Sequence, residues 1–177
     1  GFCSYKNHSI YKIILSVEKE KFACETLLLR SFFHQFKKKP QEYYDYLKGK
    51  ITRQDLFNAY PNNFHNAKDS IMNLELGVGH NSLKVSNKIK TLINKNSHWV
   101  LLGGPPCQAY SVAGRSKIKN IKGKQLFEND NRHKLYKQYL RIISDHAPSV
   151  FIMENVKGLI SSKIEDKNTL NDILKDL

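Results

Sequence analysis

One cysteine follows a segment that could hold a thiol ready for nucleophilic attack. Cys107 comes directly after a short apolar run and the bend Gly103-Gly104-Pro105-Pro106. Because proline fixes φ, such a bend is rigid and can hold a side chain in a defined, exposed position. A reactive cysteine must be a thiolate, which nearby cations or oriented backbone amides favour. Considered alone, however, Cys107 fits a small buried cysteine at a turn better.

Two acids also follow apolar runs. Glu154 comes directly after Val150–Met153, and Glu18 ends the run that starts at Ile10. An acid at the mouth of a buried strand is partly desolvated, which favours its protonated form and lets it donate a proton near neutrality. In nucleoside-binding α/β domains, an acid placed like Glu18 accepts hydrogen bonds from ribose hydroxyls. The alternatives are a salt-bridged Glu154 and a solvated Glu18.

These three residues require elements that bring them to one place. The predicted strands cover residues 10–18, 99–102 and 150–153. The predicted helices, from the spacing of apolar residues, cover 20–38, 83–94 and 131–146. Strands that alternate with helices predict an α/β domain with a mainly parallel sheet. Ligands of such sheets bind at the carboxyl ends of the strands, where Glu18, Cys107 and Glu154 fall.

Two segments do not follow this alternation. Residues 40–75 are polar, aromatic and charged, and we expect two or three short helices there that form an insertion. One of these helices is predicted to begin at a capping box, Thr52-Arg53-Gln54-Asp55. Residues 108–129 are polar and rich in lysine and arginine, and we predict a mobile loop.

Composition narrows the class of protein. The net charge is +13, from 29 Lys and Arg against 16 Asp and Glu. A basic surface attracts polyanions, so nucleic acid is the first candidate partner. Lysines that only keep the protein soluble would give the same charge. The three cysteines are scattered and never form a C-x-x-C pair, which argues against disulfides and a metal site and favours a reducing, intracellular setting. No apolar run reaches about 18 residues, so we expect no membrane span.

Taken together, these segments resemble a known family. Gly103 to Ser111 resembles the catalytic motif of the cytosine-C5 DNA methyltransferases, and Phe151 to Leu159 resembles their second catalytic motif, built on Glu-Asn-Val. Their order along the chain makes chance similarity remote. Three further segments resemble family motifs or occupy their expected positions. Gly1 and Phe2 resemble the end of the glycine-rich cofactor loop, and Glu18, with Lys19 beside it, lies where the ribose-binding acid is expected. Asp130, Arg132 and Leu135 resemble the motif between the two catalytic motifs.

The resemblance implies a Rossmann-like fold that uses S-adenosylmethionine and yields S-adenosylhomocysteine. It also implies that Cys107 attacks C6 of cytosine, while Glu154 contacts N3 and supplies a proton there, with Asn155 in the same catalytic set. C5 then accepts the methyl group, and loss of the C5 proton expels the cysteine. Because C6 cannot be reached inside a duplex, the cytosine must be flipped out of double-stranded DNA.

The resemblance further assigns binding residues. Those expected to bind the cofactor are Gly1, Phe2, Glu18, Lys19, Pro106 and Leu135, and those expected to contact DNA are Gln108, Ser111 and Arg115. Simple solvation of Arg115 and ordinary packing of Pro106 and Leu135 remain open alternatives. The family acid that reads adenine has no clear counterpart, and Asp69 and Glu75 are weak candidates.

The sequence departs from the family pattern at both ends. The run expected before Gly1, the later motif with paired arginines and the target-recognition domain are absent, so we expect residues 1–177 to be an incomplete catalytic domain that is inactive or weak alone. We expect a cytoplasmic or nucleoid-associated enzyme of bacterial type, serving restriction-modification or epigenetic modification. The alternatives are a tRNA cytosine-C5 methyltransferase and a catalytically inactive nucleic-acid-binding fragment. The residues Ala109-Tyr110-Ser111 look more like the DNA enzymes.

Overall fold

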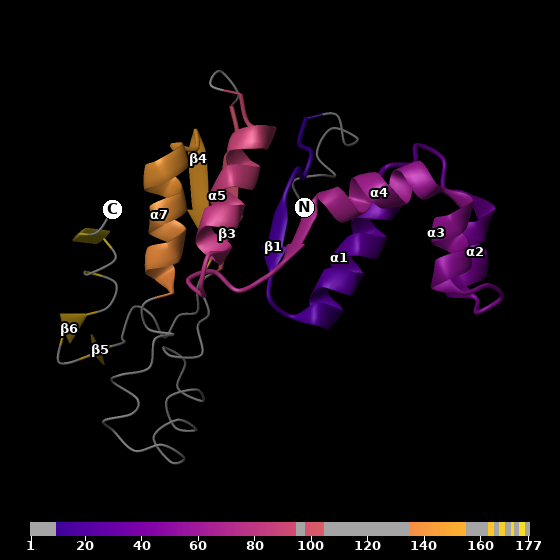
Figure 1. Ribbon diagram of the computed structural model, residues 1–177, viewed down its shortest axis with the longest axis horizontal. Helices are drawn as coiled ribbons and strands as arrows, with labels where there is room; N and C mark the ends of the chain where they lie inside the picture. The colour runs from indigo at the N-terminus through magenta and orange to yellow at the C-terminus, as the bar shows by residue number, and fades with distance from the viewer. Residues whose placement is uncertain are drawn as a thin grey trace, which may run out of the picture. The chain divides into compact units, whose positions relative to one another are not determined.

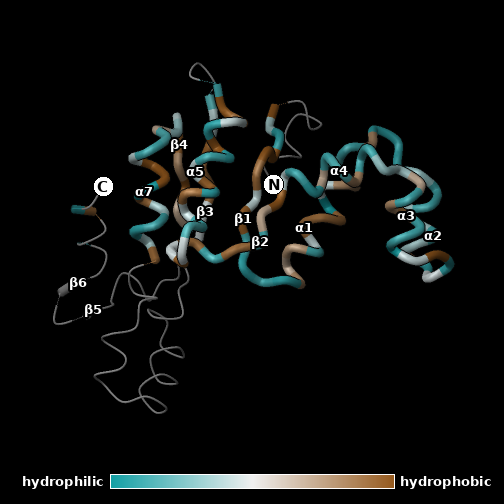
Figure 2. The backbone as a smooth tube through the Cα atoms, in the orientation of Figure 1, coloured by the Kyte–Doolittle hydropathy of each residue, from teal (hydrophilic) through white to brown (hydrophobic). Residues whose placement is uncertain are grey.

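The structure is a computed structural model. It describes residues 10–94, 98–104 and 135–154, and also 163–164, 167–168, 171 and 174–175. The chain divides into two compact units, Gly1–Glu75 and Leu76–Leu177. Figure 1 labels the helices and most strands of each unit, and Figure 2 also labels β2.

The first unit is organised around a pair of parallel strands. Strand β1 (Ser16–Glu18) leads into helix α1 (Lys21–His34), and β1 pairs in parallel with β2 (Ile71–Asn73). Within this register Glu18 lies opposite Asn73. The carboxyl ends of two strands therefore meet at one edge, and Glu18 lies on that edge.

The strand and helix predicted at the start of the chain are confirmed, with shorter bounds. The strand begins at Ser16 rather than at residue 10, and the helix ends at His34 rather than at residue 38. The ammonium group of Lys39 donates hydrogen bonds to the carbonyl oxygens of Phe33, at 2.9 Å, and Phe36. Carbonyls at a helix end lack intrahelical partners, so this lysine satisfies them where the helix stops.

Three short helices connect α1 to β2, as the sequence predicts. They are α2 (Gln41–Leu47), α3 (Arg53–Ala59) and α4 (Pro61–Asp69). The predicted capping box is present, since the Asp55 backbone N–H donates to Thr52 Oγ1 at 3.1 Å and the Thr52 N–H donates to Asp55 Oδ2 at 2.9 Å. Figure 2 shows α2 and α3 as mainly hydrophilic segments.

Residues 71–73, at the end of the segment where we predict short helices, form strand β2 of the sheet. A strand of three residues is too short for apolar alternation to reveal it. Its backbone groups are satisfied by pairing with β1, which is distant in sequence. That residues 40–75 are an insertion stays a prediction.

The first unit has a hydrophobic core between its helices. Phe32, Leu56, Phe57 and Ala67 are buried there. The ring of Phe32 meets that of Phe57 edge-on, with 5.1 Å between centroids, which is a favourable arrangement of aromatic rings. This core packs α1, α3 and α4 together.

The second unit contains the strands that lead into the two predicted catalytic motifs. Strand β3 (Val100–Gly103) pairs in parallel with β4 (Val150–Met153), and Gly103 lies opposite Met153. Helix α5 (Asn81–Leu92) packs against α7 (Tyr136–His146). The predicted type of all four elements is confirmed, and the bounds of most of them differ from the prediction by a few residues. Two further short strands, β5 (Lys163–Ile164) and β6 (Lys167–Asn168), pair antiparallel.

The expectation that these strands are buried is not met. Leu102 is 51% exposed, and Val150 is 52% exposed. The described strands form three sheets of two strands each, and a sheet this small leaves much of its surface uncovered. The structure confirms an α/β protein with parallel strand pairs, and a single Rossmann-like sheet stays a prediction. No helix among the described residues is long and apolar enough to cross a membrane.

Candidate functional site

The described part of the chain includes four of the predicted site residues: Glu18, Lys19, Leu135 and Glu154. The other predicted site residues lie outside the described residues: Gly1, Phe2, Pro106, Cys107, Gln108, Ser111, Arg115 and Asn155. The loop predicted over residues 108–129 lies outside them as well.

Glu18 is held at the carboxyl edge of the first unit's sheet. Its side chain is half-buried, and its Oε1 accepts the backbone N–H of Glu20 at 2.8 Å. Its backbone carbonyl accepts the N–H of Leu74 at 3.0 Å. Within the described part of the chain, Oε2 has no hydrogen-bond partner. The carboxylate is thus fixed in place with one oxygen able to accept bonds from a ligand.

The side chains that hold the turn after Glu18 are not among the residues predicted from the sequence. The Asn73 Nδ2 lies 3.0 Å from the carbonyl oxygens of both Glu18 and Lys19, and 3.2 Å from the sulfur of Cys24. The buried Cys24 thiol donates to the Glu18 carbonyl at 3.2 Å. These contacts tie β2 to the turn between β1 and α1. The one sequence signal for Asn73 is its position after the apolar pair at residues 71–72.

Lys19 makes an exposed ion pair with Glu75, one of the two acids considered for binding the adenine of the cofactor. Its Nζ lies 3.5 Å from Oε1 of Glu75, and both side chains are largely exposed. Such a surface pair contributes little to stability. Asp69 lies instead at the end of α4. The geometry therefore places Glu75, and not Asp69, beside the turn that carries Glu18.

The strands that lead to the two predicted catalytic motifs end side by side. The Glu154 backbone N–H donates to the Gly103 carbonyl at 2.8 Å. A Cβ at Gly104 would lie 3.6 Å from the Glu154 carbonyl oxygen, so the two residues are in close contact. The segment that continues to Cys107 and the segment that starts at Glu154 therefore leave the sheet at the same edge.

The predicted desolvation of Glu154 is not observed, because the residue is exposed. Residues 150–152 before it are exposed too, so the described part of the chain provides no apolar surroundings for the carboxylate. Leu135, predicted to line the cofactor site, is half-buried and directly precedes α7. Its carbonyl accepts the N–H of Gln138 at 3.1 Å, which forms the first turn of the helix.

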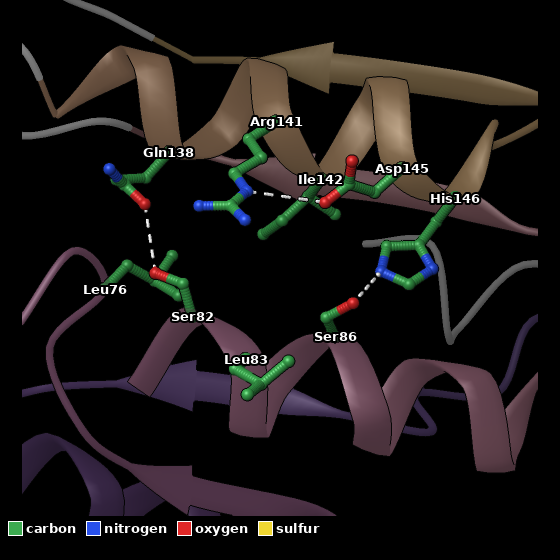
Figure 3. A pocket seen from close by; sticks show the side chains of 9 residues that line it. All are labelled: Leu76, Ser82, Leu83, Ser86, Gln138, Arg141, Ile142, Asp145 and His146. Carbon is green, nitrogen blue, oxygen red and sulfur yellow. Dashed lines mark hydrogen bonds and ion pairs between the residues drawn. The ribbon is translucent and has the colours of Figure 1, made fainter. Parts of the chain in front are cut away.

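A small cavity lies between α5 and α7 (Figure 3). Ser82 Oγ donates to Gln138 Oε1 at 3.0 Å, and Ser86 Oγ lies 2.9 Å from His146 Nε2. The cavity holds about 40 Å³, against roughly 300–1,000 Å³ for pockets that bind drug-sized ligands. It is therefore a polar contact between two helices rather than a substrate site. Among the described residues, no group of three His, Cys, Asp or Glu side chains could hold a metal ion.

Comparison with known proteins decides the family. A model of the C-5 cytosine-specific DNA methylase family matches residues 53–177, which is more than half of the chain. The chain belongs to the C-5 cytosine-specific DNA methylase family. The matched range includes both adjacent strand ends, at Gly104 and Glu154, and the cysteine at position 107.

Several named relatives of this DNA methylase chain are bacterial or viral. The type II methyltransferase M.Bpa9945I of Bacillus paralicheniformis is 33% identical over 171 residues, covering 86% of this chain and 37% of that protein. The type II methyltransferase M.FnuDI of Fusobacterium nucleatum is 40% identical over 76 residues, covering 43% of this chain and 19% of that protein. The orphan methyltransferase M.SPRI of Bacillus phage SPR is 45% identical over 73 residues, covering 41% of this chain and 14% of that protein. The chain thus spans 37% or less of these relatives. No solved structure matches it significantly.

Proposed function

We propose that this DNA methylase chain carries the catalytic cysteine and glutamate of a DNA (cytosine-5-)-methyltransferase. The observation that carries the proposal is the contact between the two strand ends, in which the Glu154 N–H donates to the Gly103 carbonyl at 2.8 Å. Three peptide bonds separate Gly104 from Cys107, so covalent geometry keeps the Cα atoms of these two residues within about 11 Å of each other. The thiol and the carboxyl group can therefore act on one base.

In the proposed reaction, the Cys107 thiolate adds to C6 of cytosine while Glu154 holds N3 and donates a proton there. Asn155 belongs to the same catalytic set. The addition makes C5 electron-rich, and C5 takes up the methyl group. Transfer of the C5 proton to water or another base then restores the C5–C6 double bond and releases the thiolate, and N3 returns its proton to Glu154. The covalent route splits one difficult step into easier ones. Because Glu154 is exposed, we infer that bound DNA excludes water from it.

S-adenosylmethionine supplies the methyl group when bound. The Oε2 of Glu18, which has no hydrogen-bond partner among the described residues, suits the ribose hydroxyls of this cofactor, because carboxylates at strand ends accept such bonds. Lys19 lies in the same turn. The other residues proposed for the cofactor are Gly1, Phe2, Pro106 and Leu135.

The proposed substrate is double-stranded DNA with the target cytosine flipped out of the helix. The proposed DNA contacts are Gln108, Ser111 and Arg115, and the net charge of +13 suits a polyanionic partner. The relatives named above are called type II methyltransferases and an orphan methyltransferase. We propose that this enzyme likewise serves restriction-modification or epigenetic modification. We accordingly propose that the enzyme acts with the DNA in the cytoplasm or nucleoid.

The test is covalent trapping by the full-length protein on duplex DNA that contains 5-fluorocytosine. With S-adenosylmethionine present, methyl transfer leaves fluorine at C5 in place of the proton that must be lost. The adduct between Cys107 and the base therefore persists and can be measured on a denaturing gel. We expect Cys107→Ser to abolish the adduct and Glu154→Gln to slow its formation by about 100-fold or more. His65→Gln, at an exposed position on α4 away from the proposed site, is the control and should keep the adduct. Trapping by Cys107→Ser at the wild-type rate would refute the assignment.

The tRNA alternative is not favoured, because the matched family is one of DNA methylases. Methyl transfer by the full-length protein to duplex DNA and to tRNA separates the two substrates, and we expect transfer to DNA. The same assay on residues 1–177 alone tests whether this segment is active by itself. We expect little or no turnover, and robust turnover would overturn that expectation.

A further inference from the structure

One tyrosine contacts both strands that lead into the predicted catalytic motifs. Tyr139 lies on α7 and is only 7% exposed. Its hydroxyl donates to the carbonyl oxygen of Ile152, on β4, at 2.9 Å. The same hydroxyl lies 3.3 Å from the carbonyl oxygen of Leu101, on β3. A single side chain therefore links the backbones of the two strands shortly before they end.

The ring of Tyr139 fixes the position of β3 as well. A Cβ added to Gly103 would overlap the Cδ2 and Cε2 atoms of this ring, so the strand approaches the tyrosine as closely as a residue without a side chain allows. On β4, the ring meets Phe151 edge-on, with 6.4 Å between centroids. Burial raises the pKa of the Tyr139 phenol, so the hydroxyl keeps the proton that it donates.

These contacts lie next to the point where the chain leaves the sheet. Gly103 accepts the backbone N–H of Glu154, and a Cβ at Gly104 would lie within van der Waals distance of Glu154. Ile152 precedes Glu154 by two residues, and Gly103 precedes Cys107 by four. A change in the spacing of the strands at Tyr139 would therefore move both segments that carry the proposed reacting groups.

We propose that Tyr139 is a positioning residue for methyl transfer, whose hydroxyl and ring set the spacing of the strand ends that carry Cys107 and Glu154. The proposal rests on the proposed function of these two residues. Positioning is a strong contributor to rate, because a displacement of about 1 Å can cost roughly 100-fold. In the proposed role, Tyr139 touches neither substrate nor cofactor and acts only through the two strands.

The experiment compares Tyr139→Phe with the wild type in the full-length protein, measuring kcat and KM for S-adenosylmethionine on duplex DNA. Phenylalanine keeps the ring and removes only the hydroxyl. We expect kcat to fall by about tenfold with KM changed less than about twofold. The matched control is Tyr60→Phe, which removes a tyrosine hydroxyl that donates to Glu42 at 2.9 Å in the first unit. This control should keep kcat within about twofold of the wild type.

A second measurement separates positioning from a general loss of structure. If Tyr139 acts by aligning Glu154, the effect of Tyr139→Phe on kcat shrinks in a Glu154→Gln background, whereas a general loss of folded protein would reduce both backgrounds equally. Equal kcat values for Tyr139→Phe and Tyr60→Phe, or full additivity with Glu154→Gln, would overturn the positioning role alone. A Cys107→Ser protein as active as the wild type would overturn the proposed function and this inference together.

Discussion

At the scale of single residues, two neighbouring glycines have different surroundings. A Cβ at Gly103 would overlap the ring of Tyr139, whereas a Cβ at Gly104 would meet Glu154 at ordinary contact distances of 3.6 and 3.9 Å. Overpacking a filled site typically costs about 1–3 kcal/mol. We therefore expect Gly103→Ala to lower the free energy of unfolding by that amount and Gly104→Ala to leave it nearly unchanged. Urea denaturation of both variants measures the difference, and equal values would contradict the close approach of Tyr139.

Sequence reasoning placed Glu18 and Glu154 correctly at strand ends, because an acid that follows an apolar run is visible locally. It missed Asn73, whose amide contacts the carbonyl groups of Glu18 and Lys19, 55 and 54 residues earlier. It also missed the role of Tyr139, which it placed only on the apolar face of a helix. Contacts to the backbone of distant residues leave no periodic pattern, so neither could be predicted.

At the scale of elements, the capping box of α3 gives a testable contribution to stability. Thr52 Oγ1 accepts the N–H of Asp55, and removing such a cap costs about 1 kcal/mol. We expect Thr52→Ala to lower the free energy of unfolding by about that amount, while Thr52→Ser keeps the hydroxyl and the stability. Urea titrations at neutral pH measure both variants, and an equal loss in both would argue against the cap.

The capping box of Thr52 and Asp55 makes the stability of α3 depend on pH. Hydrogen bonds from the Thr52 side chain and then its backbone lower the pKa of Asp55 below its ordinary value of 3.8. A group whose pKa is lowered by folding stabilises the fold above its unfolded pKa, and this contribution is lost as the pH falls through the folded pKa. The stability gap between wild type and Thr52→Ala should therefore narrow below about pH 4. A gap that stays constant into acid would contradict this assignment.

The contact between α5 and α7 should weaken in mild acid. Burial lowers the pKa of His146 below 6.5, and Lys90 acts in the same direction, while Asp145 opposes them. The neutral ring contacts Ser86 at 2.9 Å. The unfolded chain binds the His146 proton more tightly than the folded chain does. The contribution of His146 to the free energy of unfolding is therefore fully present above about pH 6.5 and is lost as the pH falls through the pKa of His146 in the folded chain.

Urea unfolding of the chain at pH 7.5 and 5.5 measures this effect. We expect His146→Gln to flatten the dependence on pH, because it removes the titrating ring. The control is His65→Gln, at an exposed position on α4, which should retain the wild-type slope. A wild-type slope in His146→Gln would show that other groups cause the loss of stability.

At the scale of the whole molecule, the two compact units allow an independent test of the core. Phe32 is fully buried in the first unit, and truncation of a buried phenylalanine to alanine costs about 3–5 kcal/mol. The chain's single tryptophan, Trp99, lies in the second unit. In Phe32→Ala we expect far-ultraviolet circular dichroism to report unfolding at lower urea than Trp99 fluorescence does. Coincident transitions would show that the two units unfold as one.

The sequence by itself determined the alternation of strands and helices, the family and the order of the catalytic motifs. These follow from apolar periodicity, capping residues and short runs of residue types, which are properties of neighbouring positions. Only the tertiary structure decided that residues 71–73 pair with β1, that β4 is exposed and that Tyr139 links the two strands that end beside Glu154. Strand pairing and burial depend on residues far apart in the chain, and their free energy comes from contacts that exist only after folding.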